Sequence, residues 1–444
     1  MARLFGTDGV RGLAGEELTE DLAYGLGYAA VVVLGRHGEG HPTFVVGRDP
    51  RASGEWLEDA LVEGIRHAGG DALIAGVEPT PAIAFLTTTL GASSGVVISA
   101  SHNPPEYNGI KFFDRTGTKL ADAIEDEIEA VLAGPQDAAD RPGQTLPMGD
   151  GRERYFAHLV DAAQASLEGM SVVVDCANGA ASELAPALLQ RLGATVHAIN
   201  ADPDGKNIND GCGALYPEVV AAEVLRVGAN AGVSHDGDAD RALFADAQGA
   251  IVDGDQVLAA CAVDLKHRGE LPGNTVVTTV MANLGFHHAM REAAIDVVAS
   301  KVGDRYVLED MMRIDAPLGG EQSGHVIFRE RSTTGDGLLT AVRFLSLATR
   351  TGSSIRELAS VMHRYPQRMI NVDVVDRDAL EAAEPVWAAV ATSESTLGQD
   401  GRVLVRASGT EPLVRVMVEA ATEDLASSHA ETIADAVRTS IGVA

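Results

Sequence analysis

Short apolar runs rich in β-branched residues alternate along this chain with longer segments whose apolar residues recur about every 3.6 positions. The short runs are typical of buried strands, and the longer segments are typical of helices that pack one face on a sheet. Strands and helices that alternate in this way form βαβ units, in which neighbouring strands are mostly parallel. The sequence therefore predicts an α/β fold, and its clearest strands lie at residues 43–49, 93–101, 170–179 and 274–285.

The length of 444 residues indicates several domains, because one hydrophobic core rarely grows beyond about 250–300 residues. Similar polar loops end three of the strands and open a helix, at 47–49, 175–179 and 281–283. This similarity indicates three related α/β domains with mixed, mostly parallel sheets. From Met369 onward the pattern changes to that of a smaller α+β domain, with a β-hairpin at 401–420.

Linker composition predicts where these domains meet. A stretch at 133–151 is rich in Pro, Gly and Asp, and the composition changes again near 364–369. Ligand sites in α/β folds lie at the carboxyl ends of strands and between domains, so we expect the domains to surround a central cleft. The predicted domains are 1–150, 151–252, 253–366 and 367–444.

Acidic residues outnumber basic ones almost two to one, with 64 Asp and Glu against 34 Lys and Arg. This balance disfavours nucleic acid as a partner, and an anionic ligand would need a few basic groups gathered in one place or a bound cation. Cysteines 176, 212 and 261 are far apart and lack metal-ligand spacing, which favours a reducing cytoplasm over a disulfide framework. No stretch has the length and apolarity of a signal peptide or membrane span, so we expect no membrane partner.

The stretch SASHNPPEYNGIKFF, at 99–113, follows a predicted strand and delivers Ser101 and His102 into a loop. Two prolines follow and stiffen that loop. A rigid, exposed turn suits a nucleophile or a carrier of phosphate, because both need an oxygen held in fixed geometry. The alternative is that Ser101 caps a turn and that His102 is a solvated neighbour.

Three aspartates alternate in the stretch SHDGDADRA, at 234–242. In an extended loop, Asp236, Asp238 and Asp240 would point to one side, where a hard divalent cation could draw the carboxylates together. An EF-hand is excluded, because the sixth position of its loop requires Gly and is Arg241 here. Arg241 would suit a phosphate beside the metal. The alternative is a plain acidic surface loop.

A third loop, in the stretch LGGEQSGHVIF, brings Glu321, Ser323 and His325 to one face by alternation. A carboxylate, a hydroxyl and an imidazole together suit a polyhydroxylated ligand, because the carboxylate accepts hydrogen bonds from hydroxyls or an amine. The alternative is a hairpin with incidental polar residues.

A fourth loop, in VRASGTEPLVR, places Ser408, Gly409 and Thr410 between Arg406 and Arg415. Backbone N–H groups, hydroxyls and two guanidinium groups are the means by which proteins hold phosphate monoesters. This loop supplies the local positive charge that the acidic composition otherwise lacks. The alternative is a structural hairpin.

Taken together and in this order, these stretches resemble the α-D-phosphohexomutase superfamily over essentially the whole chain. SASHNP, DGDADR, GGEQSGH and RASGTEPLVR are that superfamily's phosphoserine, metal, sugar and phosphate loops. The opening FGTDGVRG, which presents Arg11 between glycines, and the compact length are most similar to the bacterial phosphoglucosamine mutase family. The resemblance implies a cytoplasmic isomerase that interconverts glucosamine 6-phosphate and glucosamine 1-phosphate on the route to UDP-N-acetylglucosamine.

The resemblance also implies a role for each loop, one loop to each predicted domain. Ser101 would be the phosphoserine, and the ligands that hold Mg²⁺ with its phosphate would be Asp236, Asp238 and Asp240. Around the transferring phosphoryl group would lie Arg11, Lys111 and Arg241, with His102 and Asn103 completing the serine loop. The sugar would be contacted by Glu321 and Ser323, with His325 close by, and by Asp304 and Arg305. The phosphate that is not reacting would be held by Arg406, Ser408, Gly409, Thr410 and Arg415.

The implied reaction hands the phosphoryl group of Ser101 to the free hydroxyl of the sugar monophosphate. The product is a hexose 1,6-bisphosphate, which also acts as activator, turns around and returns its other phosphate to Ser101. Lys111 and His325 are both candidates for moving the hydroxyl proton. The sequence leaves open whether a kinase primes Ser101 and whether the protein is a monomer or a homodimer.

Three rival functions share these residues. A phosphomannomutase or phosphoglucomutase would use the same scaffold and chemistry on another hexose. The stretch DGDAD at 236–240 is loosely similar to the D-x-D-x-[TV] motif of phosphatases with an aspartate nucleophile. The fifth position of that motif is Thr or Val, however, and is Asp240 here. A sugar-phosphate sensor would bind the ligand without turnover.

Overall fold

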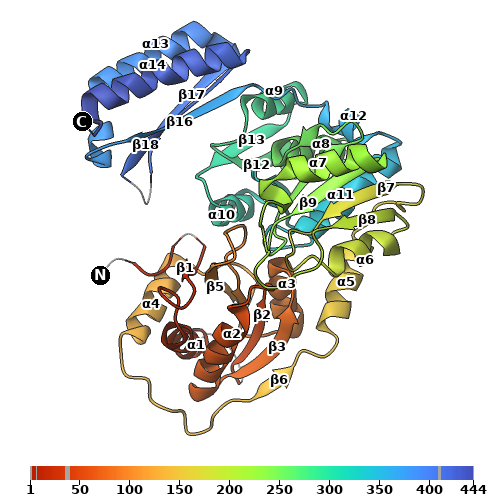
Figure 1. The fold of residues 1–444 in the computed structure, drawn as a ribbon, viewed down its shortest axis with the longest axis vertical. Helices are drawn as coiled ribbons and strands as arrows, with labels where there is room; N and C mark the ends of the chain where they lie inside the picture. The colour runs from red at the N-terminus through yellow and green to blue at the C-terminus, as the bar shows by residue number, and fades with distance from the viewer. Residues whose placement is uncertain (1–2, 7, 36–40, 409–411, 444) are drawn as a thin grey trace. The chain divides into compact units, whose positions relative to one another are not determined.

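The computed structural model describes residues 3–6, 8–35, 41–408 and 412–443. The chain forms two compact units, one of residues 1–281 and 294–361, and the other of residues 282–293 and 362–444. Three sheets belong to the first unit and one to the second (Figure 1).

The first sheet has six strands from the N-terminal part of the chain. β2 pairs in parallel with β3 and β4, whereas β5 pairs antiparallel with β4 and β1. In spatial order, the strands are β1 (Val10–Leu13), β5 (Tyr107–Asp114), β4 (Ser94–Ile98), β2 (Thr43–Arg48), β3 (Asp71–Val77) and β6 (Thr145–Pro147). The helices of this part are α1 (Glu20–Leu34), α2 (Gly54–His67), α3 (Thr80–Leu90) and α4 (Asp122–Leu132).

Both faces of this sheet are buried, which explains why its strands are continuous apolar runs in the sequence. Phe44 and Val46 of β2 belong to a core shared with α1, α2 and α4. Val45, between them, points the other way and packs with Ile83 and Leu86 of α3. Successive side chains of a strand point to opposite faces, so one short run supplies both cores.

The sequence suggested a linker at 133–151, but part of this stretch belongs to the first sheet. Residues 145–147 form β6, which pairs in parallel with β3. This strand is short and largely exposed, and it ends in a proline, which sheets tolerate at an edge. Three residues of this kind carry no alternation that sequence analysis could recognise.

The second and third sheets are also mixed. The second runs in the order β11 (Ile251–Val252), β10 (Ala242–Asp246), β9 (Ala231–His235), β7 (Ser171–Asp175) and β8 (Thr195–Ile199). The third runs in the order β13 (Asp296–Ser300), β12 (Thr275–Thr279), β14 (Leu318–Gly320) and β15 (Val326–Phe328). The helices of this part are α5 (Gly151–Asp161), α6 (Leu184–Arg191), α7 (Pro217–Val227), α8 (Gly254–His267), α10 (Asp304–Ile314), α11 (Gly337–Thr351) and α12 (Ile355–Ala359). Short 3₁₀ turns occur at Gly213–Leu215 (η2) and Pro272–Asn274 (η3).

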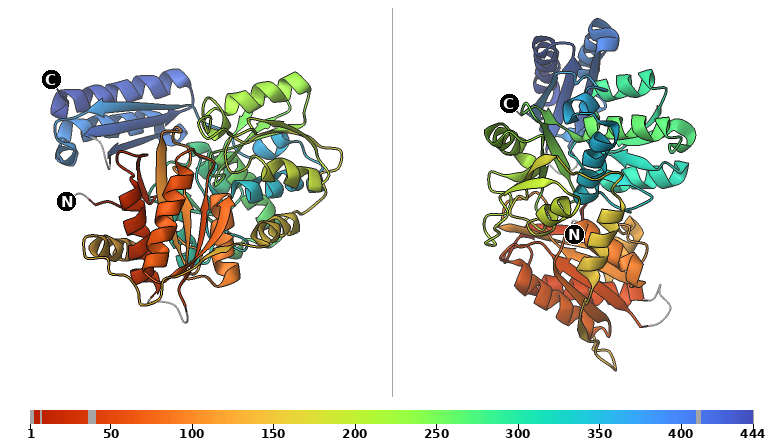
Figure 2. Two further views of the ribbon diagram at one scale, coloured as in Figure 1. Left: turned by 60° about the horizontal axis from the view of Figure 1, so that its bottom comes forward. Right: turned by 90° about the vertical axis from the view of Figure 1, so that its right-hand side faces the viewer.

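The second unit contains a three-stranded antiparallel sheet in the order β16 (Gln367–Asp373), β18 (Leu413–Ala420) and β17 (Gly401–Ala407). Two long helices, α13 (Glu384–Leu397) and α14 (Glu423–Ile441), lie together on one side of it (Figures 1 and 2). Valines of the sheet pack against Ile433 and Val437 of α14 in one core. The remaining elements are α9 (Leu284–Glu292), η4 (Arg377–Leu380) and η5 (Gly398–Asp400). The predicted α/β fold class, with a smaller α+β part at the C-terminus, is confirmed.

The candidate loops of the first unit follow the carboxyl ends of three strands. β4 leads to Ser101, β9 leads to the aspartate loop at 236–241, and β14 leads to Glu321. Ligand sites in α/β folds are built at such strand ends, because the loops are free there while the sheet holds them in place. None of the described helices is long and apolar enough to cross a bilayer.

Candidate active site

Ser101 lies in the loop directly after β4, with a backbone φ of 52°. Its Oγ donates a hydrogen bond to Oδ2 of Asp236 at 2.7 Å and lies 3.3 Å from Nδ1 of His102. We expected an exposed serine, but only 1% of Ser101 is exposed. The aspartate loop covers it. The two loops lie so close together that a Cβ on Gly237 would come within 2.6 Å of the Ser101 carbonyl oxygen. The two loops therefore form one site.

Asp236, Asp238 and Asp240 bring oxygen atoms to within 4.8 Å of one another, and all three side chains are buried. The loop is not extended, as the alternation suggested, but turns at Ala239 with a φ of 57°. The carboxylates converge all the same. Oδ1 of Asp238 and Oδ1 of Asp240 are buried without a hydrogen-bond partner among the described residues. Orphaned carboxylate oxygens gathered in this way fit a hard divalent cation such as Mg²⁺.

The charges of this cluster are unequal. Burial, and then repulsion from Asp240 and Asp238, raises the pKa of Asp236 well above its ordinary value. Burial would also raise the pKa of Asp238, but Lys111 and the Thr80 hydroxyl outweigh it and hold that pKa below its ordinary value. A bound cation would offset the repulsion among the carboxylates that raises the pKa of Asp236.

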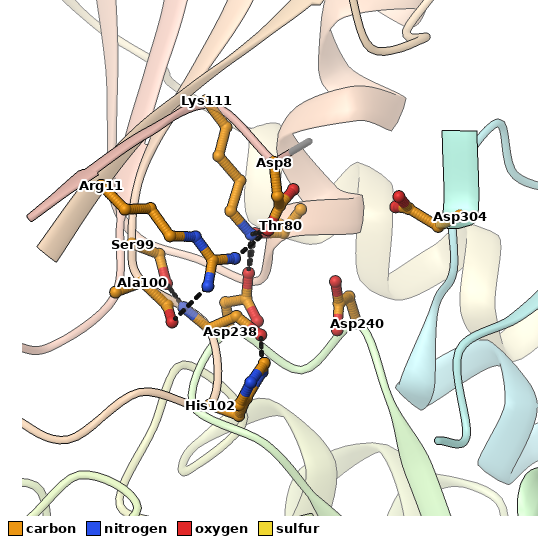
Figure 3. A network of polar contacts seen from close by, with 12 residues as sticks. Asp8, Arg11, Thr80, Ser99, Ala100, His102, Lys111, Asp238, Asp240 and Asp304 are labelled. Atoms are coloured by element: carbon orange, nitrogen blue, oxygen red, sulfur yellow. Dashed lines mark hydrogen bonds and ion pairs between the residues drawn. The ribbon is translucent and has the colours of Figure 1, made fainter. Parts of the chain in front are cut away.

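Basic groups surround the cluster on the side of the first sheet. Nζ of Lys111 lies 2.8 Å from Oδ2 of Asp238 and 3.2 Å from Oδ2 of Asp8. Arg11 forms an ion pair with the same Asp8 and donates to the Ala100 carbonyl at 3.2 Å. Figure 3 shows these side chains pointing toward one another. Lys111 and Arg11 thus bring positive charge to the edge of the cluster, where Asp8 and Asp238 offset part of it.

Arg241 follows the aspartate loop and lies near two of its carboxylates. Its Nε lies 3.7 Å from Oδ1 of Asp240 and 3.9 Å from Oδ2 of Asp236. That nitrogen is buried and has no hydrogen-bond partner among the residues that the structure describes. A guanidinium held near two carboxylates with an unused donor is suited to a phosphoryl group placed between them.

His325 and Asp304 form a pair beside Asp240. Nε2 of His325 lies 3.3 Å from Oδ2 of Asp304 and 3.8 Å from Oδ2 of Asp240. Burial alone would lower the pKa of His325, but the two carboxylates raise it to about 9. By contrast, burial and then the charges of Arg241 and Arg11 lower the pKa of His102 to about 4. At neutral pH, one imidazole of the site is therefore charged and the other is neutral.

The remaining predicted sugar contacts are arranged differently. Oε1 of Glu321 accepts a hydrogen bond from the N–H of Gly303 at 3.1 Å, so the Glu321 loop and the loop before α10 are joined. Oγ of Ser323 is buried without a partner in the described part of the chain. Arg305 forms ion pairs with Asp122 of α4 and with Glu309. Its guanidinium is thus engaged at the surface rather than aimed at the carboxylate cluster.

A cavity of about 230 Å³ opens beside His325 and Asp304. Lys119 lines it from the segment between β5 and α4, and Leu308 and Met312 line it from α10. Its lining combines apolar and charged side chains, as the linings of small-ligand pockets do.

The predicted phosphate loop belongs to the second unit. Arg406 and Arg415 are direct cross-strand neighbours on β17 and β18. Burial, and then the charge of Arg415, lowers the pKa of Arg406. Two guanidinium groups that repel each other create a place where an anion is favourable. Ser408 donates its N–H to the Leu413 carbonyl at 2.8 Å, whereas Gly409 and Thr410 lie outside the described residues.

Comparison with known proteins identifies the family. Phosphoglucomutase/phosphomannomutase alpha/beta/alpha domains I, II and III match residues 2–138, 153–249 and 253–365, and the C-terminal domain of the same family matches residues 369–436. The chain belongs to the phosphoglucomutase/phosphomannomutase family. These matches cover most of the chain in the order of the family's own domains.

Relatives of this chain include bacterial phosphoglucosamine mutases. The protein of that name from Thermobifida fusca is 52% identical over 447 residues and covers 100% of both chains, and the one from Rhodococcus jostii is 52% identical and covers 98% of this chain and 99% of its own. Among solved structures, a phosphoglucomutase/phosphomannomutase family protein from Burkholderia thailandensis superposes with a TM-score of 0.85 at 25% identity, covering 99% of each chain. An Aspergillus fumigatus N-acetylphosphoglucosamine mutase, solved with GlcNAc-6P and magnesium, has the same fold, with a TM-score of 0.72 at 19% identity over 99% of this chain and 96% of its own.

In this phosphohexomutase, sequence analysis missed three residues of the site. Asp8 joins Lys111, Lys119 and Arg11, and Lys119 extends the contact to Asp304. Thr80, the first residue of α3, donates its hydroxyl to Oδ2 of Asp238 at 2.6 Å. Asp8 lies in the stretch FGTDGVRG, three positions before Arg11. Lys119 and Thr80 gave no signal, since single lysines and threonines are common.

Proposed function

We propose that this chain is a phosphoglucosamine mutase that interconverts glucosamine 6-phosphate and glucosamine 1-phosphate through a phosphoserine and a bisphosphate intermediate. The observation that carries the proposal is the 2.7 Å hydrogen bond from Oγ of Ser101 to Asp236, within a buried cluster of three carboxylates. A serine oxygen beside a cation site and among fixed cations is what phosphoryl transfer needs. The relatives at 52% identity support glucosamine phosphate as the substrate.

We assign Mg²⁺ to Asp236, Asp238 and Asp240, together with a phosphate oxygen on Ser101. The all-oxygen donor set and the two orphaned carboxylate oxygens favour this cation. When bound, Mg²⁺ neutralises charge on the phosphoryl group in transfer.

The chain's own residues would then align and neutralise the transferring group. In the first half-reaction, the bond from phosphorus to Oγ of Ser101 breaks, and a bond forms to the free hydroxyl oxygen of the sugar monophosphate. Arg11 and Lys111 would face the phosphoryl oxygens from the first sheet, and Arg241 would face them from the second. Because the transition state is loose, alignment and charge contribute more than covalent help.

The sugar hydroxyl must lose its proton as the new bond forms. Lys111 and His325 are the candidates. Neighbouring carboxylates raise the pKa of both, so either group must release its own proton before it can accept the one from the sugar hydroxyl. The same protonated groups are suited to return a proton to Ser101 as its phosphate leaves. Both Lys111 and His325 therefore stay candidates for the proton transfer. His102, which is neutral and close to Oγ of Ser101, would position the serine hydroxyl.

The bisphosphate would turn around so that its second phosphate returns to Ser101. Glu321 and Ser323 would hold the sugar hydroxyls or amine, with Asp304, Arg305 and His325 near the cavity beside them. The phosphate that is not reacting would be held by Arg406, Ser408, Gly409, Thr410 and Arg415. We propose four domains with one loop each: a phosphoserine-loop domain at 1–150, a metal-binding domain at 151–252, a sugar-binding domain at 253–366 and a phosphate-binding domain at 367–444.

Several features of the cell biology follow from this function. We propose a cytoplasmic enzyme that supplies glucosamine 1-phosphate for UDP-N-acetylglucosamine synthesis. A hexose 1,6-bisphosphate would activate it by placing a phosphate on Ser101, and a kinase is a second route to the same state. It would act as a monomer or a homodimer.

The test is a comparison of initial rates with Mg²⁺, a catalytic amount of glucose 1,6-bisphosphate and the 6-phosphates of glucosamine, glucose and mannose. We expect a strong preference for glucosamine 6-phosphate. A preference for glucose or mannose would keep the mechanism and overturn the substrate, leaving a phosphoglucomutase or phosphomannomutase. Release of inorganic phosphate would indicate a phosphatase, and binding without turnover would indicate a sensor.

A further inference from the structure

A buried arginine outside the carboxylate cluster holds the serine loop from within. Arg51 follows β2, and only 1% of it is exposed. Its guanidinium donates to the carbonyl oxygens of Ser101 at 3.0 Å and Asn103 at 2.8 Å. It also donates to the carbonyls of Tyr107, at 3.0 Å, and Pro104. One side chain therefore holds four carbonyls, three in the loop that carries the serine and one at the start of β5.

Asp49 orients this arginine and reaches the serine by a second route. Oδ2 of Asp49 accepts a hydrogen bond from Nε of Arg51 at 2.9 Å and one from Oγ of Ser99 at 2.6 Å. The same Ser99 hydroxyl accepts the N–H of Ser101 at 2.9 Å. The N–H and the carbonyl of Ser101 are thus both tied, directly or through Ser99, to one buried ion pair.

Arg51 is one arm that holds the serine loop, and a second arm comes from the loop that follows β8 in the same unit. Asn209 lies between β8 and η2, and its Nδ2 donates to the carbonyls of Ser101 at 2.9 Å and Asn103 at 3.0 Å. These are two of the carbonyls that Arg51 holds. The N–H of Ala52 also donates to the carbonyl of Gly205 at 2.9 Å, so the segments that carry the two arms are joined.

The backbone of Ser101 explains why so many donors are needed. Its φ of 52° lies in the left-handed region, which serine rarely adopts. Such a conformation persists only where the surroundings over-determine it, and it is found most often at functional sites. Because Cβ is fixed by the backbone, the same contacts decide where Oγ points.

We propose that Asp49, Arg51, Ser99 and Asn209 form a clamp of positioning residues that aims Oγ of Ser101 for phosphoryl transfer. This inference rests on the proposed function. The alternative is that the clamp only joins two sheets. The two roles differ in what they change, because a clamp that aims the serine affects the chemical step even in a fully folded protein.

The test uses two mild variants, since replacement of Arg51 would leave the buried Asp49 unpaired and could prevent folding. Asn209→Ala removes one arm, and Ser99→Ala removes the link to the Ser101 N–H. Two matched controls have buried groups that do not touch the serine loop. Asn178→Ala removes an asparagine that bonds to Asn207 and Asp202, and Ser94→Ala removes a β4 hydroxyl that donates to Phe113.

Four quantities are measured for each protein. They are kcat and KM for glucosamine 6-phosphate, the melting temperature, and the rate at which dephosphorylated enzyme takes up phosphate from glucose 1,6-bisphosphate, which is followed by intact mass. We expect Asn209→Ala and Ser99→Ala to lower kcat and the uptake rate by on the order of 10- to 100-fold, because small misplacements of a reacting atom cost this much. KM should stay within about twofold, since the groups that hold the sugar are untouched.

The controls should keep kcat within about twofold even where their melting temperatures fall as far as those of the clamp variants. The inference is overturned if the clamp variants keep the kcat of the wild type, or if they lose no more of it than the controls. If the wild type converts none of the three hexose phosphates and takes up no phosphate, the proposed function fails and the inference fails with it. A turnover defect confined to the clamp variants supports both.

Discussion

Nζ of Lys111 lies 2.8 Å from Oδ2 of Asp238, and both side chains are buried. Burial would lower the pKa of Lys111, but Asp238 and Asp8 outweigh it and raise that pKa above its ordinary value. The lysine in turn holds the pKa of Asp238 down. The pair is therefore fully ionised, so one carboxylate of the cluster is charged before any cation binds. Lys111 thus contacts Asp238 of the candidate metal site and, through Asp8, lies close to Arg11, which would face the phosphoryl oxygens.

Replacing Lys111 by Met should damage both stability and catalysis. Asp238 and Asp8 would lose a buried counter-charge, so we expect the free energy of unfolding to fall by about 3–5 kcal/mol. The phosphoryl oxygens would lose a fixed cation, so kcat should fall by on the order of 10²–10³-fold. Urea unfolding and steady-state kinetics measure the two effects. Lys266→Met, which removes a hydrogen bond to the Ala294 carbonyl on the surface, is the control and should cost no more than about 1.5 kcal/mol. An unchanged kcat in Lys111→Met would remove this residue from the mechanism.

Ser101→Ala should abolish the mutase activity while the fold remains. The variant lacks the oxygen that carries the phosphate, so its intact mass should not rise after incubation with glucose 1,6-bisphosphate. Wild type and Ser94→Ala should each gain one phosphate under the same conditions. A phosphate found on Ser101→Ala would show that another residue is the carrier.

Removal of divalent metal should stop the reaction and lower the melting temperature. The carboxylates of Asp236, Asp238 and Asp240 repel one another without a cation, so EDTA should abolish turnover and Mg²⁺ should restore it. A ligand that binds only the folded state stabilises it by about 2.7 kcal/mol at 100 times its Kd. Differential scanning calorimetry with and without Mg²⁺ measures the shift. The Asp240→Asn variant should lose most of the shift, and an equal shift in that variant would place the cation elsewhere.

Much of the site could be predicted because its residues stand close together in sequence. Asp236, Asp238 and Asp240 occupy one loop, for which the sequence left a cation site and a plain acidic surface loop open, beside a loosely similar phosphatase motif. In the structure the three carboxylates converge because the loop turns at Ala239. The alternation of the aspartates did not require this turn. The strands could also be predicted from short stretches of sequence. Both faces of the sheet are buried, so each strand, such as the one before Ser101, is a continuous apolar run.

The parts that could not be predicted depend on contacts between distant segments. Thr80 and Asp238 are 158 positions apart, and Asn209 and Ser101 are 108 apart. No spacing rule joins such pairs, and single threonines and asparagines carry no signal of their own. The burial of Ser101 was missed for the same reason, because the loop that covers it comes from another sheet. A short edge strand such as β6 lacks the length that a pattern needs.

Arg415→Ala should weaken substrate binding while leaving Ser101 able to carry phosphate. A hydrogen bond to a charged group contributes about 1.5–3 kcal/mol, so KM for glucosamine 6-phosphate should rise by on the order of 10- to 100-fold. Arg438→Ala, on the exposed face of α14, is the control and should leave KM unchanged. The phosphate content of Ser101 is read by intact mass. Loss of phosphorylation in Arg415→Ala would contradict the division of labour between the serine loop and the phosphate loop.

Asp336 should make the stability of the protein depend on pH in the mildly acidic range. This carboxyl caps α11, accepts a hydrogen bond from the buried Tyr155 hydroxyl at 2.9 Å and is itself 1% exposed. Burial raises its pKa from 3.8 to about 6. A pKa that is higher in the folded state than in the unfolded state means that the protonated form contributes stability below the unfolded pKa. That contribution is lost as the pH rises through about 6.

Asp336→Asn removes this titration while keeping an oxygen that can cap the helix. We expect wild type to lose free energy of unfolding relative to Asp336→Asn between pH 4 and pH 7, by on the order of 2 kcal/mol. Urea unfolding of both proteins at a series of pH values measures the difference. The Tyr155 hydroxyl stabilises the ionised carboxylate, so Tyr155→Phe should move the transition to higher pH. A difference between wild type and Asp336→Asn that stays constant across this range would mean that Asp336 keeps its charge in the fold.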